Sequence, residues 1–306
     1  MHPQTYKVVS FILKICQNKK SLLFWFFIRF LSAILPLVTI YQFSTVIKLL
    51  EQKAPPESVV LAVFYIFLIR VIDNLTRLRS ITKLEYEIAA VSFDIHNFFL
   101  SDLKTFSKSE RHEIVQAIRN FSDASSSTLN LIKQPGIDSL VSILFIPAIL
   151  LFLDFPAFVL NIAYISVYYV VDFYSTQRYA HLKKILNTHT ETYFAKLQDS
   201  NDFDLEQRSW SRHFRRLVNW GNAEWNLIKN TAVIFYSLIL FFQISQVISG
   251  GKQISDLVLV MGYITQTQVY LNSFSSIKDS LTDMLVGLDR LASNPTVSTV
   301  DLDDLI

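Results

Sequence analysis

A single helical pattern near the C-terminal end, from Ile254 to Ser293, places the strongest constraint on what this chain can fold into. Its apolar side chains recur at alternating steps of four and three residues, which is the heptad seam of a helix packed on other helices. No proline interrupts the pattern, and Asn294-Pro295 gives a stop signal after it. The seam consists of Tyr270, Phe274, Ile277, Leu281, Met284, Leu288 and Leu291.

A helix of about 40 residues is about 60 Å long, whereas the hydrocarbon core of a bilayer is about 30 Å thick. We therefore expect this helix to cross a membrane and to project well beyond it. The polar turn from Ser249 to Lys252 precedes the helix, and Ser255-Asp256 is expected to cap it. A long soluble coiled-coil arm is the alternative, and the uncharged run from Leu257 to Ile277 argues against it.

The composition supports a membrane protein. The chain is 51% hydrophobic with a mean hydropathy of +0.33, which is typical of integral membrane proteins. A net charge of only +2 argues against a nucleic-acid-binding protein. The single cysteine, Cys16, excludes an intrachain disulfide and a cysteine-based zinc site.

The apolar runs predict an all-α membrane protein with six long transmembrane helices. Pro36 lies inside the first of them and is expected to kink it. The six predicted spans are 21–50, one beginning near Ser58, 136–153, 156–174, 227–248 and the helix from Ile254.

The connections between these spans are very uneven. Those on one side are seven residues or fewer and contain only Lys53 and Lys252 as basic residues, whereas 77–135 and 175–225 on the other side are long. The positive-inside rule places the long connections and both termini in the cytoplasm. We expect the membrane to be the plasma (bacterial inner) membrane. The basic residues of the long connections include Arg77, Arg79, Lys83, Arg111, Arg119, Arg178, Lys183, Lys184, Arg212, Arg215 and Arg216.

The long connections have a helical composition. Apolar residues at helical spacing continue the second and fourth spans, so we expect cytoplasmic helical extensions that end in polar reversals near 106–110 and 200–204. The apolar series are Leu84, Ile88, Val91, Ile95 and Phe98, and Tyr179, Leu182, Leu186, Tyr193 and Leu197. Residues 1–20 are predicted to form an amphipathic helix along the membrane surface, and a cleaved signal peptide is the alternative.

The segment from Val247 to Ser293 resembles the last two-helix turn and the sixth helix of an ABC exporter transmembrane domain. The matching positions are Gly251, Ile254, Asp256, Leu257, Tyr263, Leu288, Asp289, Arg290 and Leu291. The resemblance extends from about Lys20 to Asn294 and implies the type I exporter fold. It divides the chain into an N-terminal elbow helix (1–20), a six-helix transmembrane domain (21–294) and an acidic tail (295–306).

The resemblance implies a permease subunit that acts as a homo- or heterodimer of transmembrane domains in membrane lipid and moves a substrate by alternating access. Coupling helices at the two reversals would contact separate ATPase subunits. The implied coupling residues are Ser107, Lys108, Ser109, Glu110, Asp202, Phe203 and Asp204. The chain departs from the family pattern at His112, where the family has glycine, and at Ala117, near an expected arginine.

No residues of this sequence predict catalysis. The chain contains no Gly-x-x-x-x-Gly-Lys-Ser/Thr phosphate loop, so ATP and Mg²⁺ would be bound by a partner and no cofactor by this chain. His112-Glu113 is followed by Gln116 where a zinc protease needs histidine, so no metal site is expected. The basic and aromatic segment from Trp210 to Trp225 favours interface anchors over nucleic-acid or anionic-lipid binding.

Polar side chains inside the spans are the candidates for a substrate cavity, because charges at membrane depth are costly and face a partner or water. Arg70 and Asp73 could simply pair with each other, and the remaining stripes could serve plain helix–helix hydrogen bonding. The candidates are Arg29, Arg70, Asp73, Gln243, Gln246, Tyr263, Gln266, Tyr270 and Ser273.

Three other functions remain open from the sequence. An ATPase-free permease of the same fold, driven by a gradient, would require acids such as Asp73 and Asp172 to titrate. A membrane receptor, immunity or scaffold protein would use the fold as a binding platform, and one half of a split transporter is also compatible. A cavity lined by Tyr, Gln and Arg suits a peptide, a lipid or an amphipathic molecule, and nothing in the sequence selects among them.

Overall fold

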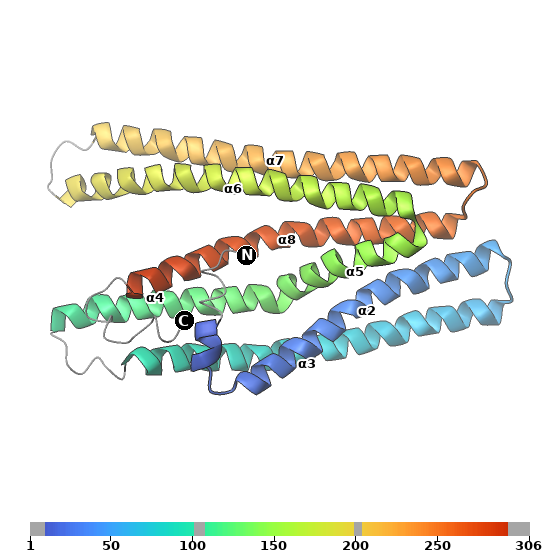
Figure 1. The fold of residues 1–306 in the computed structure, drawn as a ribbon, viewed down its shortest axis with the longest axis horizontal. Coiled ribbons are helices and arrows are strands. Elements are labelled where there is room, and N and C mark those ends of the chain that lie inside the picture. The colour runs from blue at the N-terminus through green and yellow to red at the C-terminus, as the bar shows by residue number, and fades with distance from the viewer. Residues whose placement is uncertain (1–9, 101–107, 199–203, 293–306) are drawn as a thin grey trace. The chain divides into compact units, whose positions relative to one another are not determined.

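The computed structural model describes residues 10–100, 108–198 and 204–292, and these residues form helices joined by short turns, without a strand. Figure 1 shows the ribbon. The helices are α2 (Lys19–Glu51), α3 (Pro56–Leu100), α4 (Lys108–Leu131), the π-helical η2 (Ile132–Gly136), α5 (Ile137–Leu153), α6 (Phe155–Gln198), α7 (Asp204–Ile248) and α8 (Ile254–Ala292).

Five helices of the described residues are long and apolar enough to cross a membrane, so the chain is an all-α protein of integral membrane character. They are Lys19–Glu51, Pro56–Phe99, Ile118–Leu153, Phe155–Tyr179 and Gln207–Ile248. The expected long helix at the C-terminal end is present as α8, with 39 residues, but it is not among these five.

The chain divides into two compact units. Unit 1 consists of 1–146 and 253–306, and unit 2 consists of 147–252. Within unit 1, α2 and α3 lie side by side, and α4 packs on both α3 and α8. Within unit 2, α6 and α7 form one long antiparallel pair.

Short turns join the helices where the sequence places polar residues. The α2–α3 turn includes Lys53 with a φ of 50°, and the α7–α8 turn includes Gly250 with a φ of 74°, a conformation that glycine adopts without a steric cost. At the start of α8, the Glu51 carboxylate accepts hydrogen bonds from the backbone N–H groups of Ile254 (2.9 Å) and Ser255 (3.2 Å). The prediction of Ser255 as a cap is therefore wrong, since α2 supplies the main capping carboxylate.

Asp256 does take the predicted capping role. Its Oδ2 accepts a hydrogen bond of 3.1 Å from the backbone N–H of Gln253, the residue before α8. This is the return half of a capping box. Ser255 is instead buried, and its carbonyl oxygen accepts a hydrogen bond of 2.8 Å from Ser44 of α2.

The predicted helical extensions are confirmed, because α3 and α6 continue without a break through their apolar series. Residues 10–15 are also helical, and Phe11 and Ile12 are buried in a core with side chains of α3, α4 and α8. Protein therefore covers the apolar side of this short helix, where the sequence predicted contact with the membrane surface.

One predicted boundary is wrong. The sequence suggests that a new span begins at Gly136, but α4 runs through η2 into α5 as one helical rod, and a single candidate span covers Ile118–Leu153. Pro135 lies inside η2 and cannot donate a backbone hydrogen bond, so the rod adopts a π turn there instead of ending.

A close contact between α2 and α8 depends on glycine. A Cβ atom on Gly262 would lie 2.7 Å from Cγ2 of Ile40, which is too close for a carbon–carbon contact. The absence of a side chain at this position therefore allows the two backbones to approach.

Candidate functional site

Unit 1 contains a buried cluster of four charged side chains from three segments of the chain. Arg29 comes from α2, Asp73 and Arg77 from α3, and Asp138 from α5. Asp138 Oδ2 lies 2.6 Å from Arg29 Nη2 and 3.1 Å from Arg77 Nη1, and Arg77 Nε lies 3.4 Å from Asp73 Oδ1. We call these four residues the ionic cluster.

Arg29 is the most deeply buried member of the ionic cluster, with a relative exposure of 0%. Besides its bond to Asp138, its guanidinium donates to Ser32 Oγ (3.1 Å) and to the carbonyl oxygen of Gln134 (3.3 Å). Gln134 lies in η2, so the π turn brings a backbone acceptor to the arginine. A planar guanidinium with several donors fits this divergent set of oxygen atoms well.

The charges of the ionic cluster sum to zero. Burying an ion is expensive unless it is paired and hydrogen-bonded, and here Asp138 is shared between two arginines while Asp73 balances the second. Two buried atoms still lack a partner among the described residues, namely Arg29 Nε and Asp138 Oδ1. The cluster therefore retains one donor and one acceptor for a further polar group.

Helix α8 supplies a tyrosine and a glutamine beside the ionic cluster. The Tyr270 side chain interacts electrostatically with Asp138, Arg77 and Arg29 and hydrogen-bonds with Gln266. Ser139 of α5 also donates to the Tyr270 carbonyl oxygen at 2.8 Å. Four of the predicted cavity residues, Arg29, Asp73, Gln266 and Tyr270, are thus gathered around one point of unit 1.

Sequence reasoning missed two members of the cluster. The sequence predicts Arg77 among the basic residues of a cytoplasmic connection, although it lies four residues after Asp73 and pairs with it. Asp138 lies two residues after Gly136, where the sequence predicts only the beginning of an apolar span. The sequence did contain a signal for Asp138. Arg29 lies inside a predicted span without a counter-charge in that span, so a carboxylate on another helix was to be expected.

The alternative that Arg70 simply pairs with Asp73 does not hold in the structure, because Asp73 pairs with Arg77. Arg70 is exposed and makes no ion pair with a residue that the structure describes. The structure therefore separates Arg70 from Arg29 and Arg77.

In unit 2, Gln243 lies near the turn end of α7. Its amide donates to Asp154, the residue before α6, and Lys252 forms an ion pair with the same carboxylate. Lys252 also donates to Gln243 Oε1 at 3.3 Å. Gln243 thus links the end of α7 to the start of α6, whereas Gln246 is half-buried and its carbonyl oxygen accepts the Gly251 N–H at 2.9 Å within the turn that follows α7.

The other two predicted cavity residues of α8 have different settings. Tyr263 is buried and donates a hydrogen bond of 3.3 Å to the carbonyl oxygen of Leu37, which is a contact between α8 and α2. Ser273 is half-buried.

In unit 2, the buried side chains of Asn161 and Tyr164 have polar atoms without a partner among the described residues, and sequence reasoning did not single them out.

The predicted coupling residues lie at the edges of what the structure describes. Ser107, Asp202 and Phe203 fall outside the described residues. Lys108, Ser109 and Glu110 form the first turn of α4, and Asp204 begins α7. The first reversal was predicted near 106–110, but Lys108–Glu110 already belong to α4, and the rest of both reversals lies outside the described residues.

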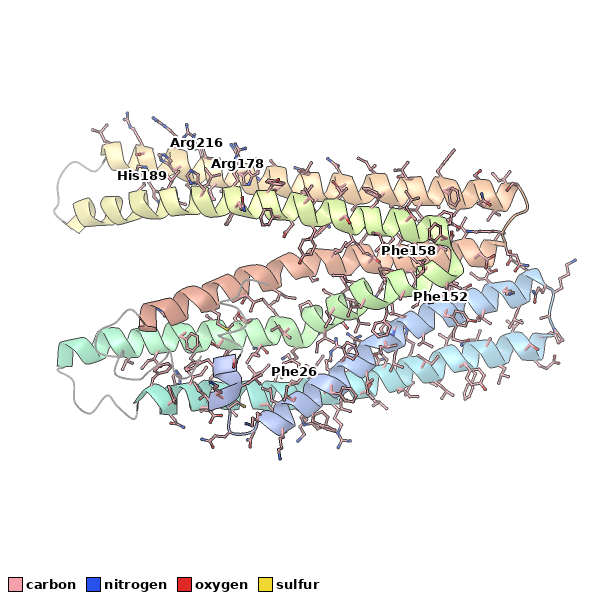
Figure 2. The ribbon with its side chains drawn as sticks, in the orientation of Figure 1. Phe26, Phe152, Phe158, Arg178, His189 and Arg216 are labelled. Atoms are coloured by element: carbon pink, nitrogen blue, oxygen red, sulfur yellow. The ribbon has the colours of Figure 1, made fainter. Side chains whose placement is uncertain are left out.

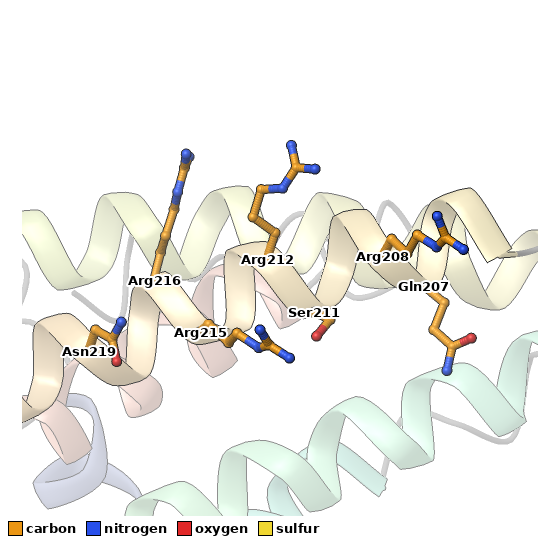
Figure 3. A pocket seen from close by; sticks show the side chains of 7 residues that line it. All are labelled: Gln207, Arg208, Ser211, Arg212, Arg215, Arg216 and Asn219. Carbon is orange, nitrogen blue, oxygen red and sulfur yellow. The ribbon is translucent and has the colours of Figure 1, made fainter.

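Helix α7 carries a row of exposed arginines, Arg208, Arg212, Arg215 and Arg216, which we call the arginine stripe. Figure 3 shows it with Gln207, Ser211 and Asn219, which line the same pocket. None of the four forms an ion pair with another described residue. Among the side chains that the structure describes, the stripe is therefore a positive surface without a counter-charge.

The side of α7 away from the arginine stripe packs on α6. The rings of His213 and His189 stack at 4.1 Å, and Trp220 Nε1 donates to the Ser175 carbonyl oxygen at 3.3 Å. Arg178 of α6 lies 4.2 Å from the centre of the Trp220 ring. Figure 2 labels Arg178, His189 and Arg216 along this helix pair.

The fold and the site define an all-α integral membrane protein with a buried, neutral ionic cluster and an exposed basic stripe. Among the described residues, no group of histidine, cysteine and acidic side chains is arranged to hold a metal ion. Neither family models nor curated proteins give a match to this chain.

Proposed function

We propose that this chain is the transmembrane subunit of an ABC-type exporter, which moves a substrate across the membrane by alternating access while separate subunits hydrolyse ATP. In this proposal the six helices α2, α3, α5, α6, α7 and α8 cross the membrane, and the ends with the reversals lie in the cytoplasm. Two such domains, identical or related, would form the substrate path.

The observation that carries the proposal is the length of the helices. Helices α3 and α7 have 45 residues each and α6 has 44. At 1.5 Å per residue they are about 66 Å long, which is about twice the hydrocarbon thickness. Continuous helices of this kind transmit a movement from a cytoplasmic partner into the membrane, and a simple receptor anchor does not need them.

In this proposal the ionic cluster lies where such a movement would be transmitted. Arg29 is 22 residues from Glu51 and Arg77 is 21 residues from Pro56, so both are about 32 Å from the α2–α3 turn. That depth is close to the inner edge of a hydrocarbon core of about 30 Å. The cluster would therefore join α2, α3, α5 and α8 at the cytoplasmic end of the path.

Purification from native membranes in a mild detergent tests the proposal. We expect a stoichiometric ATPase subunit to co-purify, and we expect Lys108→Glu or Asp202→Arg at the reversals to abolish its ATPase activity. Lys53→Glu, at the opposite end of the helices, is the control and should leave the activity intact. A clean preparation without a partner and without ATPase activity would overturn the proposal.

A further inference from the structure

Three arginines lie at membrane depth in unit 1, and they differ in their counter-charges. Arg29 and Arg77 both contact Asp138, and Arg77 also contacts Asp73. Arg70, on the same helix as Arg77, is exposed and has no carboxylate partner among the described residues. A charge in this position needs a partner or water, because a lipid-facing arginine near the bilayer centre is costly.

The depth of Arg70 limits the ways in which it can reach water. It follows Pro56 by 14 residues, which places its Cα about 21 Å from the outer end of α3 and about 9 Å short of the inner edge of the hydrocarbon core. Side chains on a helix tilt toward its N-terminus, which for α3 is the outer end. Arg70 therefore tilts away from the nearer interface.

The carboxylates of unit 1 at this depth are already engaged. Asp73 pairs with Arg77, and Asp138 is shared by Arg29 and Arg77. Pairing either of them with Arg70 would leave another buried arginine without its counter-charge. Among the described side chains of unit 1, no other carboxylate at this depth remains for Arg70, so we take the anion that neutralises it to come from elsewhere.

The surroundings of Arg70 on α3 are apolar. Val63 and Phe67 precede it by seven and three residues, on the same side of the helix, and they are 50% and 60% exposed. Asn74, four residues later, is also exposed and adds an amide to the same face. An exposed cation and amide beside a branched and an aromatic side chain match a molecule with an anionic head and an apolar body.

We infer that Arg70 binds the anionic head group of an amphipathic ligand, and that Val63 and Phe67 contact its apolar part. This inference rests on the proposed function, because it takes the exposed face of α3 to line the substrate path. Guanidinium groups bind carboxylates and phosphates through two parallel hydrogen bonds. The substrate class is therefore an acidic amphiphile, not a cationic or neutral one.

Direct binding of radiolabelled laurate to the protein in phosphatidylcholine nanodiscs tests the inference, with dodecylamine as the cationic counterpart of equal chain length. We expect laurate to bind and Arg70→Gln to weaken it about tenfold or more, since one charge-assisted bidentate contact is lost. Arg70→Lys should restore part of the affinity. Arg79→Gln, an exposed arginine nine residues further along α3, is the matched control and should bind as the unchanged protein does.

Adding phosphatidylglycerol to the nanodiscs separates the two sources of the anion. Displacement of laurate by the lipid, again dependent on Arg70, would identify a lipid head group as the ligand, and no displacement would identify a free amphiphilic acid. Equal binding of laurate to the Arg70 and Arg79 variants, or stronger binding of dodecylamine, would overturn the inference. The assay needs no ATPase subunit, so its failure is distinguishable from the failure of the proposed function.

Discussion

The ionic cluster of unit 1 and the arginine stripe of unit 2 use the same side chain in opposite ways. In the cluster, two arginines are held by Asp138, and one of them has no exposed surface at all. In the stripe, four arginines are exposed and make no ion pair with a described residue. The comparison shows that the setting, and not the residue type, decides whether an arginine contributes to stability or to surface charge.

The physical reason for this difference is solvation. A charge in water is stabilised by the solvent, so exposed ion pairs contribute about 0–1 kcal/mol. A buried charge has lost that solvation, and removing its partner costs about 3–5 kcal/mol. The two regions should therefore respond to the same substitution with very different changes in stability.

Asp138→Asn should give the largest effect. It removes the one carboxylate that Arg29 and Arg77 share, so we expect the free energy of unfolding to fall by about 3–5 kcal/mol, with a clear drop in the thermal midpoint in mild detergent. Asp123→Asn is the matched control, because Asp123 is 73% exposed and pairs only weakly with Arg119 at 3.8 Å. Equal thermal midpoints for the two variants would mean that the cluster does not stabilise unit 1.

Arg77→Gln should have an intermediate effect. Its side chain is 23% exposed, and Arg29 still pairs with Asp138 after the change, so only Asp73 loses its counter-charge. We expect a loss of about 1–3 kcal/mol, the cost of leaving a buried polar group without its partner. Double substitution of Asp73→Asn and Arg77→Gln should recover part of this loss, and a purely additive result would contradict the pairing.

Replacing all four arginines of the stripe with glutamine should leave stability almost unchanged, within about 0.5 kcal/mol, because these side chains are exposed and have no ion-pair partner among the described residues. The surface charge should change instead. On an immobilised polyanion such as heparin, the variant should elute at a lower salt concentration than the unchanged protein. A variant with four lysines keeps the charge and should elute close to the original position, and a large fall in thermal midpoint for either variant would show that the stripe is structural.

The smallest effect concerns the thiol of Cys16. Its reaction rate depends on whether the side chain is buried or exposed, as the stability effects of the arginines do. Burial raises the pKa of Cys16, so at neutral pH less of it is thiolate and its reaction with maleimide should be slow. The rate should keep rising as the pH increases above the ordinary thiol range. In a Cys16→Ser background, a cysteine introduced by Arg216→Cys should react rapidly at neutral pH, and equal rates at the two positions would contradict the burial of Cys16.

The sequence predicted the helices better than it predicted their partners. Helical periodicity is a local property, so the long α3, α6 and α8 could be read directly from it. Arg29 and Asp73 could also be recognised as unusual from the sequence, because their position deep inside a predicted span can be read from the local sequence. Their contacts depend on which helices lie side by side, and the spacing of Arg70 and Asp73 could not show that Asp73 pairs with Arg77 instead.

The turns explain two further features that the sequence did not show. Gln243 and Gln246 share a face of α7, which suggested a cavity, but the α7–α8 turn returns Lys252 to the end of the helix pair and engages Gln243 there. The Pro135-Gly136 pair normally ends a helix, and the sequence contains no sign that the chain would absorb it in a π turn.

That π turn has a consequence for how insertions and deletions in this chain act. Five residues in a wide turn occupy nearly the place of four in an α-helix, so η2 is equivalent to one inserted residue. Deleting a single residue there would restore the regular helix and leave the faces of α5 nearly unchanged relative to α4, whereas the same deletion in the regular turns of α4 just before η2 would rotate them by about 100° relative to the preceding part of α4. Asp138 would still face Arg29 in the first case and would point away from it in the second, although neither deletion replaces a residue of the ionic cluster. A one-residue deletion is therefore expected to be tolerated inside η2 and not in the α-helical turns before it.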